Sequence, residues 1–192
     1  MFFREGRGFS PCPFFFPRLA AIHACVGIPS SRMPPITAIL HTCNDADRLG
    51  RALESLRPCD ELLVIDHGST DATLRVAREY GARIRLAELN PAQESYLASA
   101  LHDWVLYLLP SESLTEGLEA SLYEWKLYEP GDVISISSCS AFVREETRDG
   151  WTEGRPSTRL IPKSWNHWDG DLPREASQSL ILQGDLLRFR LP

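Results

Sequence analysis

The sequence lacks the features that mark a membrane-spanning, nucleic-acid-binding or disulfide-stapled protein. No apolar run among its 192 residues approaches the length of a transmembrane helix. The 20 Lys and Arg are outnumbered by 26 Asp and Glu, and a net charge of −6 argues against nucleic acid or an anionic membrane as the main partner. The five cysteines are scattered and have no metal-ligand spacing, which favours reduced thiols in a cytoplasmic protein.

What is present is the composition of one ordinary globular domain, with 43% hydrophobic and 24% charged residues. Met1–Arg32 stands apart, because it holds several prolines and three consecutive phenylalanines without any periodicity. We interpret it as a disordered extension or as the product of a start codon assigned too early, with Met33 as the true start. A membrane-associating leader is the alternative. The domain proper then divides into residues 33–130 and residues 131–192.

From Pro35 to Ile84 the chain alternates between strand and helix patterns, as chains that build a parallel sheet do. Ile36–His41 and Leu62–Asp66 are short apolar runs, typical of strands covered on both faces. Between them, Leu49, Leu53 and Leu56 recur at helical spacing. The candidate N-caps are Asn44 or Asp45 for this helix, and Ser69 or Thr70 for a second helix through Ala72–Tyr80.

Further along, the patterns become shorter and the later ones alternate between apolar and polar residues. The expected helices run from Asn90-Pro91 to His102 and over Leu114–Tyr128. The expected strands are Arg83–Leu86, Asp103–Leu109, Val133–Ser137, Ala141–Arg144, Ser157–Ile161, Trp165–Trp168 and Ser179–Leu182. The predicted fold class is α/β, with a mostly parallel nucleotide-binding sheet flanked by helices and a short antiparallel C-terminal annex.

The carboxyl end of the second strand carries the run Asp66-His67-Gly68-Ser69-Thr70-Asp71. In an open α/β sheet, ligands bind outside the carboxyl ends of the strands. Asp66 there can accept hydrogen bonds from a base or a ribose, and the amides of the following helix can receive a phosphate. The structural alternative is that Asp66 only caps the turn through Gly68.

The patterns ITAILHTCNDADRLGRALESL, ELLVIDHGSTDATLRVAREYGARI and DWVLYLL resemble the family 2 glycosyltransferases, from Ile36 to about Thr115. The resemblance implies the A-type glycosyltransferase fold, which is Rossmann-like, and an inverting transfer from a nucleotide-sugar donor to a glycan or lipid-linked acceptor. The most similar subgroup modifies lipopolysaccharide cores, so the implied role is cytoplasmic assembly of cell-envelope polysaccharide, with peripheral membrane contact left open. The implied nucleotide-binding residues are Thr42, Asp66, Gly68 and Ser69.

The metal motif departs from the family pattern, in which Asp-x-Asp, usually followed by Glu, holds Mg²⁺ or Mn²⁺ against the donor diphosphate. The aligned positions are Leu109, Pro110 and Ser111, so Glu112 is the one acidic residue left. We expect at most a weak metal site, and we favour interpreting Glu112 as a solvated loop or helix-start residue.

A diphosphate leaving group also needs positive charge nearby. The Arg-Asn pair that faces the donor in the similar subgroup is replaced here by Gln93-Glu94. The basic residues available as substitutes are Arg48, Arg51, Arg144, Arg155, Arg159 and Lys163, and the sequence places none of them in the cleft.

For the general base of an inverting transfer, the late segment offers Asp169 and Asp171. The nearby Trp151, Trp165 and Trp168 suit either a sugar-stacking surface or the packed lid of a small sheet. Two functions therefore stand: a family 2-like glycosyltransferase, and a catalytically silent relative that binds nucleotide or glycan or scaffolds an assembly complex.

The composition of Met1–Arg32 generates the first test. A protein that starts at Met33 should show the melting temperature of the full chain, because a proline-rich stretch without periodicity buries little apolar surface. Differential scanning calorimetry of the two proteins measures this. A large drop in melting temperature for the shorter protein would mean that the leader packs on the domain.

Overall fold

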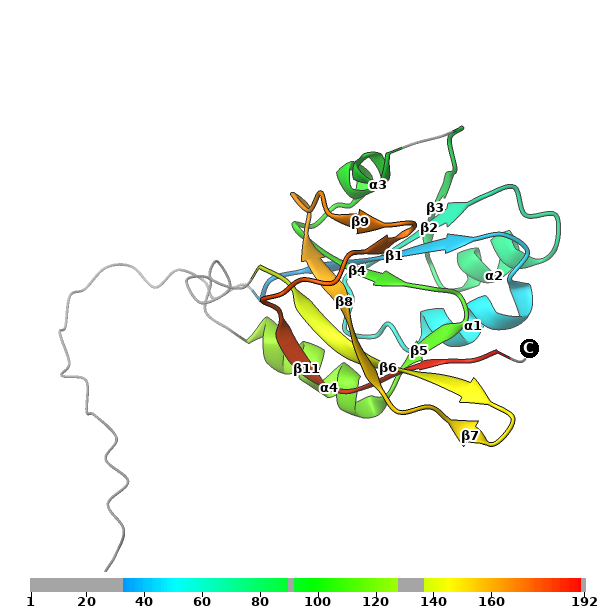
Figure 1. The fold of residues 1–192 in the computed structure, drawn as a ribbon. Coiled ribbons are helices and arrows are strands. Elements are labelled where there is room, and N and C mark those ends of the chain that lie inside the picture. The colour runs from blue at the N-terminus through cyan, green and yellow to red at the C-terminus, as the bar shows by residue number, and fades with distance from the viewer. Residues whose placement is uncertain (1–32, 90–91, 128–136, 191–192) are drawn as a thin grey trace, which may run out of the picture. The chain divides into compact units, whose positions relative to one another are not determined.

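The computed structural model describes residues 33–89, 92–127 and 137–190 (Figure 1). The strands there are β1 (Ile36–Thr42), β2 (Glu61–Asp66), β3 (Arg83–Leu86), β4 (Trp104–Leu108), β5 (Glu112–Leu114), β6 (Cys139–Thr147), β7 (Gly150–Trp151), β8 (Arg155–Pro162), β9 (Trp168–Asp169), β10 (Leu172–Pro173) and β11 (Leu180–Arg188). The helices are α1 (Ala46–Glu54), α2 (Thr73–Glu79), α3 (Gln93–Ser99) and α4 (Glu116–Lys126). The expectations for Met1–Arg32, for the Asn90-Pro91 cap and for most of Val133–Ser137 lie outside the described residues.

The first half of the chain builds the parallel part of one large sheet, whose order is β3-β2-β1-β4-β8-β6-β11-β5. β1 pairs in parallel with both β2 and β4, and β2 pairs in parallel with β3. In the register of β1 and β2, Thr42 lies opposite Asp66 at the carboxyl ends of both strands. The predicted α/β class and the order of elements through β4 are thereby confirmed.

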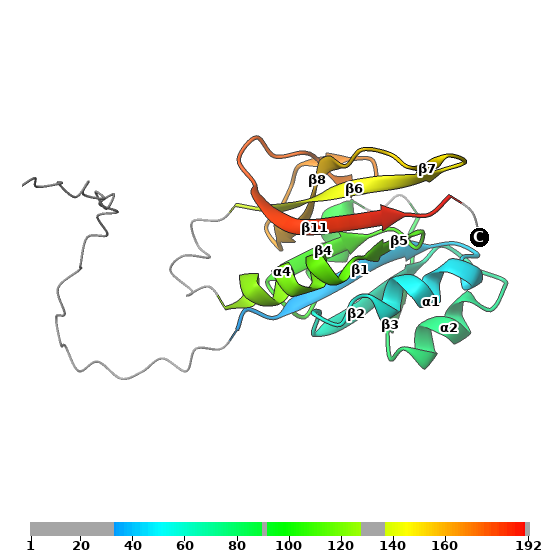
Figure 2. The same cartoon turned by 90° about the horizontal axis from the view of Figure 1, so that it is seen from below.

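Alternate side chains of these strands point to opposite faces of the sheet, and each face has its own core. Ile36, Ala38 and Leu40 pack with the buried leucines of α1 and α4. Ile39 packs on the other face with Tyr96 and Leu97 of α3. Figure 2 shows α1, α2 and α4 gathered along one side of the strands. Burial on both faces explains why β1 and β4 read as continuous apolar runs.

The second half continues the same sheet with mostly antiparallel pairing. β8 pairs antiparallel with β4 and with β6, and β11 pairs antiparallel with β5 but parallel with β6. The predicted strand at Trp165–Trp168 is wrong, since only Trp168 belongs to a strand there, the two-residue β9. The helix expected from Leu114 begins at Glu116, because Glu112–Leu114 forms β5 beside β11.

The predicted caps are only partly right. Asp45 occupies the N-cap position of α1 but its side chain makes no capping hydrogen bond, and Ala72 occupies that of α2 in place of Ser69 or Thr70. The carboxylate of Asp45 instead accepts hydrogen bonds from the Thr42 hydroxyl at 3.0 Å and the Cys43 amide at 2.9 Å. The first amides of both helices are instead bonded by Asp71, whose carboxylate accepts from the Ala46 amide at 3.2 Å and the Thr73 amide at 2.9 Å.

The sheet ends on one side at β3, a strand of four residues of which two are arginines. Arg83 bonds to the Glu61 carboxylate and to the backbone carbonyl of Ser99. Arg85 donates to the Ser95 carbonyl at 2.9 Å, and its guanidinium lies 5.3 Å from the Tyr96 ring. Both arginines thus attach the outer strand to its neighbours.

Across the described ranges, no helix combines the length and the apolar composition that crossing a membrane requires.

The close approach of β11 to α4 at Gly184 provides a test of stability. Gly184 in β11 has φ +92°, and a Cβ atom there would lie 2.2 Å from the backbone nitrogen of Leu118 in α4. Gly184→Ala should lower the free energy of unfolding by about 3 to 5 kcal/mol, because left-handed strain and overpacking add. Gly170→Ala is the matched control: φ is +60° and no atom lies within 4 Å, so the loss should be about 1 to 2 kcal/mol. Urea unfolding measures both, and equal losses would contradict the close approach.

Candidate functional site

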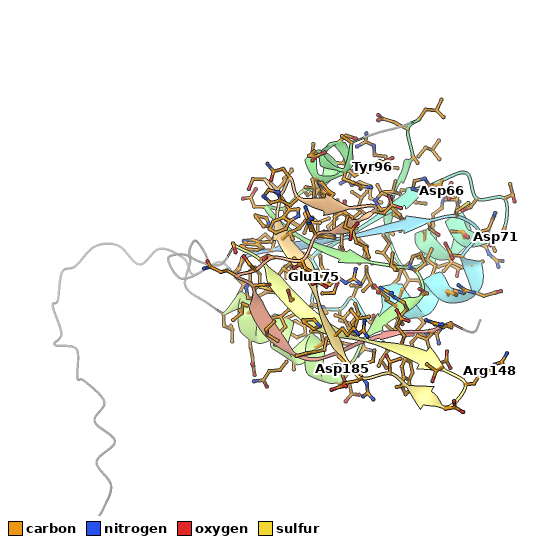
Figure 3. The ribbon with its side chains drawn as sticks, viewed as in Figure 1. Asp66, Asp71, Tyr96, Arg148, Glu175 and Asp185 are labelled. Atoms are coloured by element: carbon orange, nitrogen blue, oxygen red, sulfur yellow. The ribbon has the colours of Figure 1, made fainter. Side chains whose placement is uncertain are left out.

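The predicted nucleotide residues come together where β1 and β2 end. Asp66 is buried, and its carboxylate accepts hydrogen bonds from the Gly68 amide at 3.1 Å and the Ser69 amide at 3.1 Å. Thr42, also buried, is its partner in the sheet register. Figure 3 shows Asp66 and Asp71 at this same end of the sheet. The contacts of Asp66 are those of the structural alternative, a capped turn, and its contact with a nucleotide stays a prediction.

Asn44 ties the loop after β1 to the loop after β2. Its backbone has φ +58°, a left-handed conformation that asparagine tolerates better than most residues. The Asn44 side-chain oxygen accepts hydrogen bonds from the Thr70 amide at 2.8 Å and the Asp71 amide at 3.3 Å. The backbone amide of Asn44 donates to the Ser69 hydroxyl at 3.0 Å. The backbone amides from Gly68 to Asp71 consequently donate to Asp66 and Asn44, so few of their N–H groups are left to bind a phosphate.

A histidine pair lies beside these loops. Nδ1 of His41 is 2.9 Å from Nε2 of His67, and the His41 ring contacts the rings of Tyr96 and Tyr107. Burial, with a smaller contribution from His67, lowers the pKa of His41 to about 4, and the carboxylate of Asp171 opposes that shift. Burial also raises the pKa of the Tyr107 hydroxyl. His41 is therefore neutral at pH 7.

The two candidate bases lie on the small β9–β10 hairpin. Asp169 belongs to β9, Asp171 precedes β10, and both side chains are exposed. Asp171 accepts a hydrogen bond from Nε2 of Gln93 at 2.9 Å, and Trp168 donates to Glu94 at 3.0 Å. The hairpin is thus fastened to α3, and its Trp168 ring packs edge-on against Tyr107, whose ring stacks with His41. The role of either aspartate as a base stays a prediction.

Glu112 differs most from expectation. The interpretation as a solvated loop or helix-start residue is wrong, because Glu112 begins β5 and is fully buried. Its Oε1 accepts hydrogen bonds from Nη2 of Arg159 at 2.9 Å and from Nε and Nη2 of Arg188 at 3.0 and 2.8 Å. Its Oε2 accepts from the Leu109 amide at 2.9 Å. Burial lowers the pKa of Arg159, and the Glu112 carboxylate opposes that shift.

These contacts do not fit the Mg²⁺ or Mn²⁺ that the resemblance implies. Both oxygens of Glu112 already accept from cationic or backbone donors, and two guanidinium groups lie where a cation would have to sit. Among the described residues, no group of three or more His, Cys, Asp or Glu side chains is arranged to hold a metal ion. A hard divalent ion needs several oxygen ligands.

Two adjoining clefts open beside the later strands. The larger, of about 500 Å³, is lined by Arg155, Glu175 and Arg188 among others. The second, of about 290 Å³, includes Asp169 and shares Ser157 and Glu175 with the first. The candidate base Asp169 therefore lines one cleft, and Arg188 lines the cleft that adjoins it.

Sequence reasoning missed three residues of this region. Arg188 was not among the candidate cations, because only the pairing of β5 with β11 brings it opposite Glu112. His41 and His67 carried a weak signal, since each adjoins a predicted site residue.

Comparisons with known proteins relate part of this chain to glycosyltransferases. Residues 37–105 match the model of the glycosyl transferase family 2. An uncharacterized glycosyltransferase of Rickettsia felis is 33% identical over 91 residues, which cover 45% of this chain and 32% of that protein. The lipopolysaccharide core biosynthesis glycosyltransferase LpsC of Rhizobium meliloti is 37% identical over 46 residues, 24% of this chain and 17% of that protein.

Over residues 37–105 the chain is similar to the family 2 glycosyltransferases. It spans about a third or less of the length of these two relatives. Among solved structures, glucosyl-3-phosphoglycerate synthase of Mycobacterium tuberculosis, in complex with Mn²⁺, UDP and glucosyl-3-phosphoglycerate, has a TM-score of 0.46 and 23% identity, covering 58% of this chain and 44% of that chain.

The low pKa of His41 predicts how the stability of the protein depends on pH. Because the folded-state pKa of about 4 lies below the ordinary 6.5, the unfolded chain binds the proton first. Stability should be complete above pH 6.5 and should fall by at most about 3 kcal/mol as the pH drops towards 4. His41→Gln should lack this component.

Urea unfolding of both proteins between pH 7 and pH 4 measures the difference. Glu61 and Glu145, whose pKa values are lowered mainly by hydrogen bonds from their partners, titrate in both proteins and cancel in the comparison. Identical pH dependence in the two proteins would show that His41 is not held neutral by its surroundings.

Proposed function

We propose that this chain is the nucleotide-binding part of a family 2-like glycosyltransferase, which moves a sugar from a nucleotide-sugar donor to a glycan or lipid-linked acceptor with inversion. The observation that carries the proposal is the pairing of Thr42 with Asp66 at the carboxyl ends of adjacent parallel strands, inside the segment that matches the family. A cytoplasmic role in cell-envelope polysaccharide assembly accords with the scattered cysteines and with the name of the Rhizobium relative.

In this proposal the donor nucleotide lies over the ends of β1 and β2. Asp66 accepts hydrogen bonds from the base or ribose, and Thr42, Gly68 and Ser69 complete that contact. An acceptor hydroxyl approaches from the side of the β9–β10 hairpin, where Asp169 or Asp171 removes its proton as the sugar–phosphate bond breaks. The neutral His41 ring packs against the rings of Tyr96 and Tyr107 beside Thr42.

A catalytically silent relative that binds nucleotide or glycan is the second candidate. It is favoured by the Leu109-Pro110-Ser111 sequence and by the burial of Glu112 between two arginines. The two candidates share the nucleotide site and differ in turnover. Release of nucleoside diphosphate from a bound nucleotide sugar separates them.

The nucleotide site is tested by Asp66→Ala. The ligand is chosen by a thermal-shift screen of UDP, GDP, ADP and dTDP and their sugar derivatives, since binding to the folded state raises the melting temperature. Asp66→Ala should weaken binding of the best diphosphate at least tenfold in titration calorimetry, because a buried acceptor for the ligand is lost.

Asp66→Asn is the matched control, because its remaining oxygen can still accept from the Gly68 and Ser69 amides. The control should melt close to the wild type, whereas Asp66→Ala can also lose turn stability. An Asp66→Ala protein that remains folded and binds as tightly as the wild type would remove Asp66 from the site.

A further inference from the structure

The proposed ligand is an anion, and the described residues near the strand ends offer it little positive charge. The amides that follow β2 are engaged by Asp66 and Asn44, and the carboxylates of a metal motif are replaced by Leu109 and Ser111. A diphosphate that leaves, or merely binds, needs a compensating charge held in place.

Arg188 lies at the aligned metal motif. It pairs with Glu112 in the register of β11 and β5, and the next residue, Phe189, donates its amide to the Ser111 carbonyl at 2.8 Å. Glu112 in turn accepts from the Leu109 amide at the end of β4, the strand beside β1. A short chain of contacts therefore joins Arg188 to the carboxyl edge of the parallel strands.

The position of Arg188 is fixed from several sides. The Arg51 guanidinium of α1 lies 3.6 Å from the centre of the Phe189 ring, and Trp151 packs edge-on against the same ring at 5.2 Å. Glu112 and Glu145 hold the Arg188 guanidinium through three N–H groups. A guanidinium has five such groups, so two remain for a ligand. Preorganisation of this kind lowers the cost of binding an anion.

Two guanidinium groups share the carboxylate of Glu112. Arg159 and Arg188 both contact it, so one of these two positive charges is left without a carboxylate of its own at Glu112, while Glu145 contacts Arg188 and Arg190. The Arg159 side chain is only 2% exposed and faces inward, whereas the Arg188 side chain is 26% exposed and lines the 500 Å³ cleft. Of the two arginines on Glu112, Arg188 is the one that a ligand in the cleft can reach.

We propose that Arg188 is the fixed positive charge that receives the diphosphate of the nucleotide ligand, in place of a divalent metal ion. The inference rests on the proposed function, since it takes the ligand to be a nucleotide. Glu112 acts as the positioning residue: it orients the guanidinium and neutralises the more deeply buried Arg159. The same cleft is also lined by Glu153 and Glu175, whose carboxylates suit hydroxyl groups of a sugar.

The test compares a nucleoside diphosphate with its parent nucleoside, using the best diphosphate of UDP, GDP, ADP and dTDP. Titration calorimetry on the full chain is run with EDTA and with Mg²⁺, for wild type, Arg188→Gln, Arg188→Lys and Arg190→Gln. Arg190 is the matched control, because it also bonds to Glu145 but its side chain is 64% exposed. Thermal melting establishes that each variant is folded.

We expect the wild type to bind the diphosphate at least tenfold more tightly than the nucleoside, equally in EDTA and in Mg²⁺. Arg188→Gln should lose that tenfold gain and keep the affinity for the nucleoside, Arg188→Lys should keep most of the gain, and Arg190→Gln should keep all of it. Loss of the gain in EDTA, or its persistence in folded Arg188→Gln, would overturn the inference.

The outcomes separate the two proposals. A wild type that binds neither nucleoside nor diphosphate contradicts the proposed function, and the inference with it. A wild type that binds both with equal affinity leaves the nucleotide site in place and overturns the role of Arg188 alone. If Arg188→Gln does not fold, the EDTA comparison on the wild type and the Arg188→Lys variant still decide.

Discussion

The carboxylate of Glu112 is the interaction on which the second half of the structure depends. It joins three strands that are distant in sequence, since Arg159 comes from β8, Arg188 from β11 and Glu112 itself from β5. A carboxylate without solvent exposure is costly unless its charge is compensated, and removal of one partner leaves an uncompensated charge. The pairing therefore specifies how β11 returns to the edge of the sheet, and with it the cleft beside Arg188.

The parts of the fold that were predicted are those whose signals are local. Continuous apolar runs mark β1 and β2, and the spacing of Leu49 and Leu53 marks α1, because each pattern is contained within one element. β5 has three residues and no period, so it becomes visible only through its pairing with β11. The cap predictions failed in part for a related reason: Asn44 and Asp45 bond to neighbouring loop residues, which helix-capping preferences do not encode.

The candidate site divides in the same way. The resemblance placed Thr42 and Asp66 together, and the sheet register agrees with that placement. The sequence also showed that Leu109 and Ser111 stand where the family's metal motif has carboxylates. The proposed replacement for the positive charge of a metal ion could not be predicted, because Arg188 lies 76 positions after Glu112 and no local sequence pattern links the two residues. A long-range ion pair of this kind follows from topology, and topology was predicted only through β4.

The short outer strand β3 has a consequence for how the protein meets other chains. An unpaired edge strand is a template for strand addition, and natural sheets block such edges with short strands and charged side chains. β3 has four residues, and Arg83 and Arg85 are held against Glu61 and the backbone of α3. Edge-to-edge growth into aggregates is therefore disfavoured at this border of the sheet, even though two strongly apolar strands lie directly behind it.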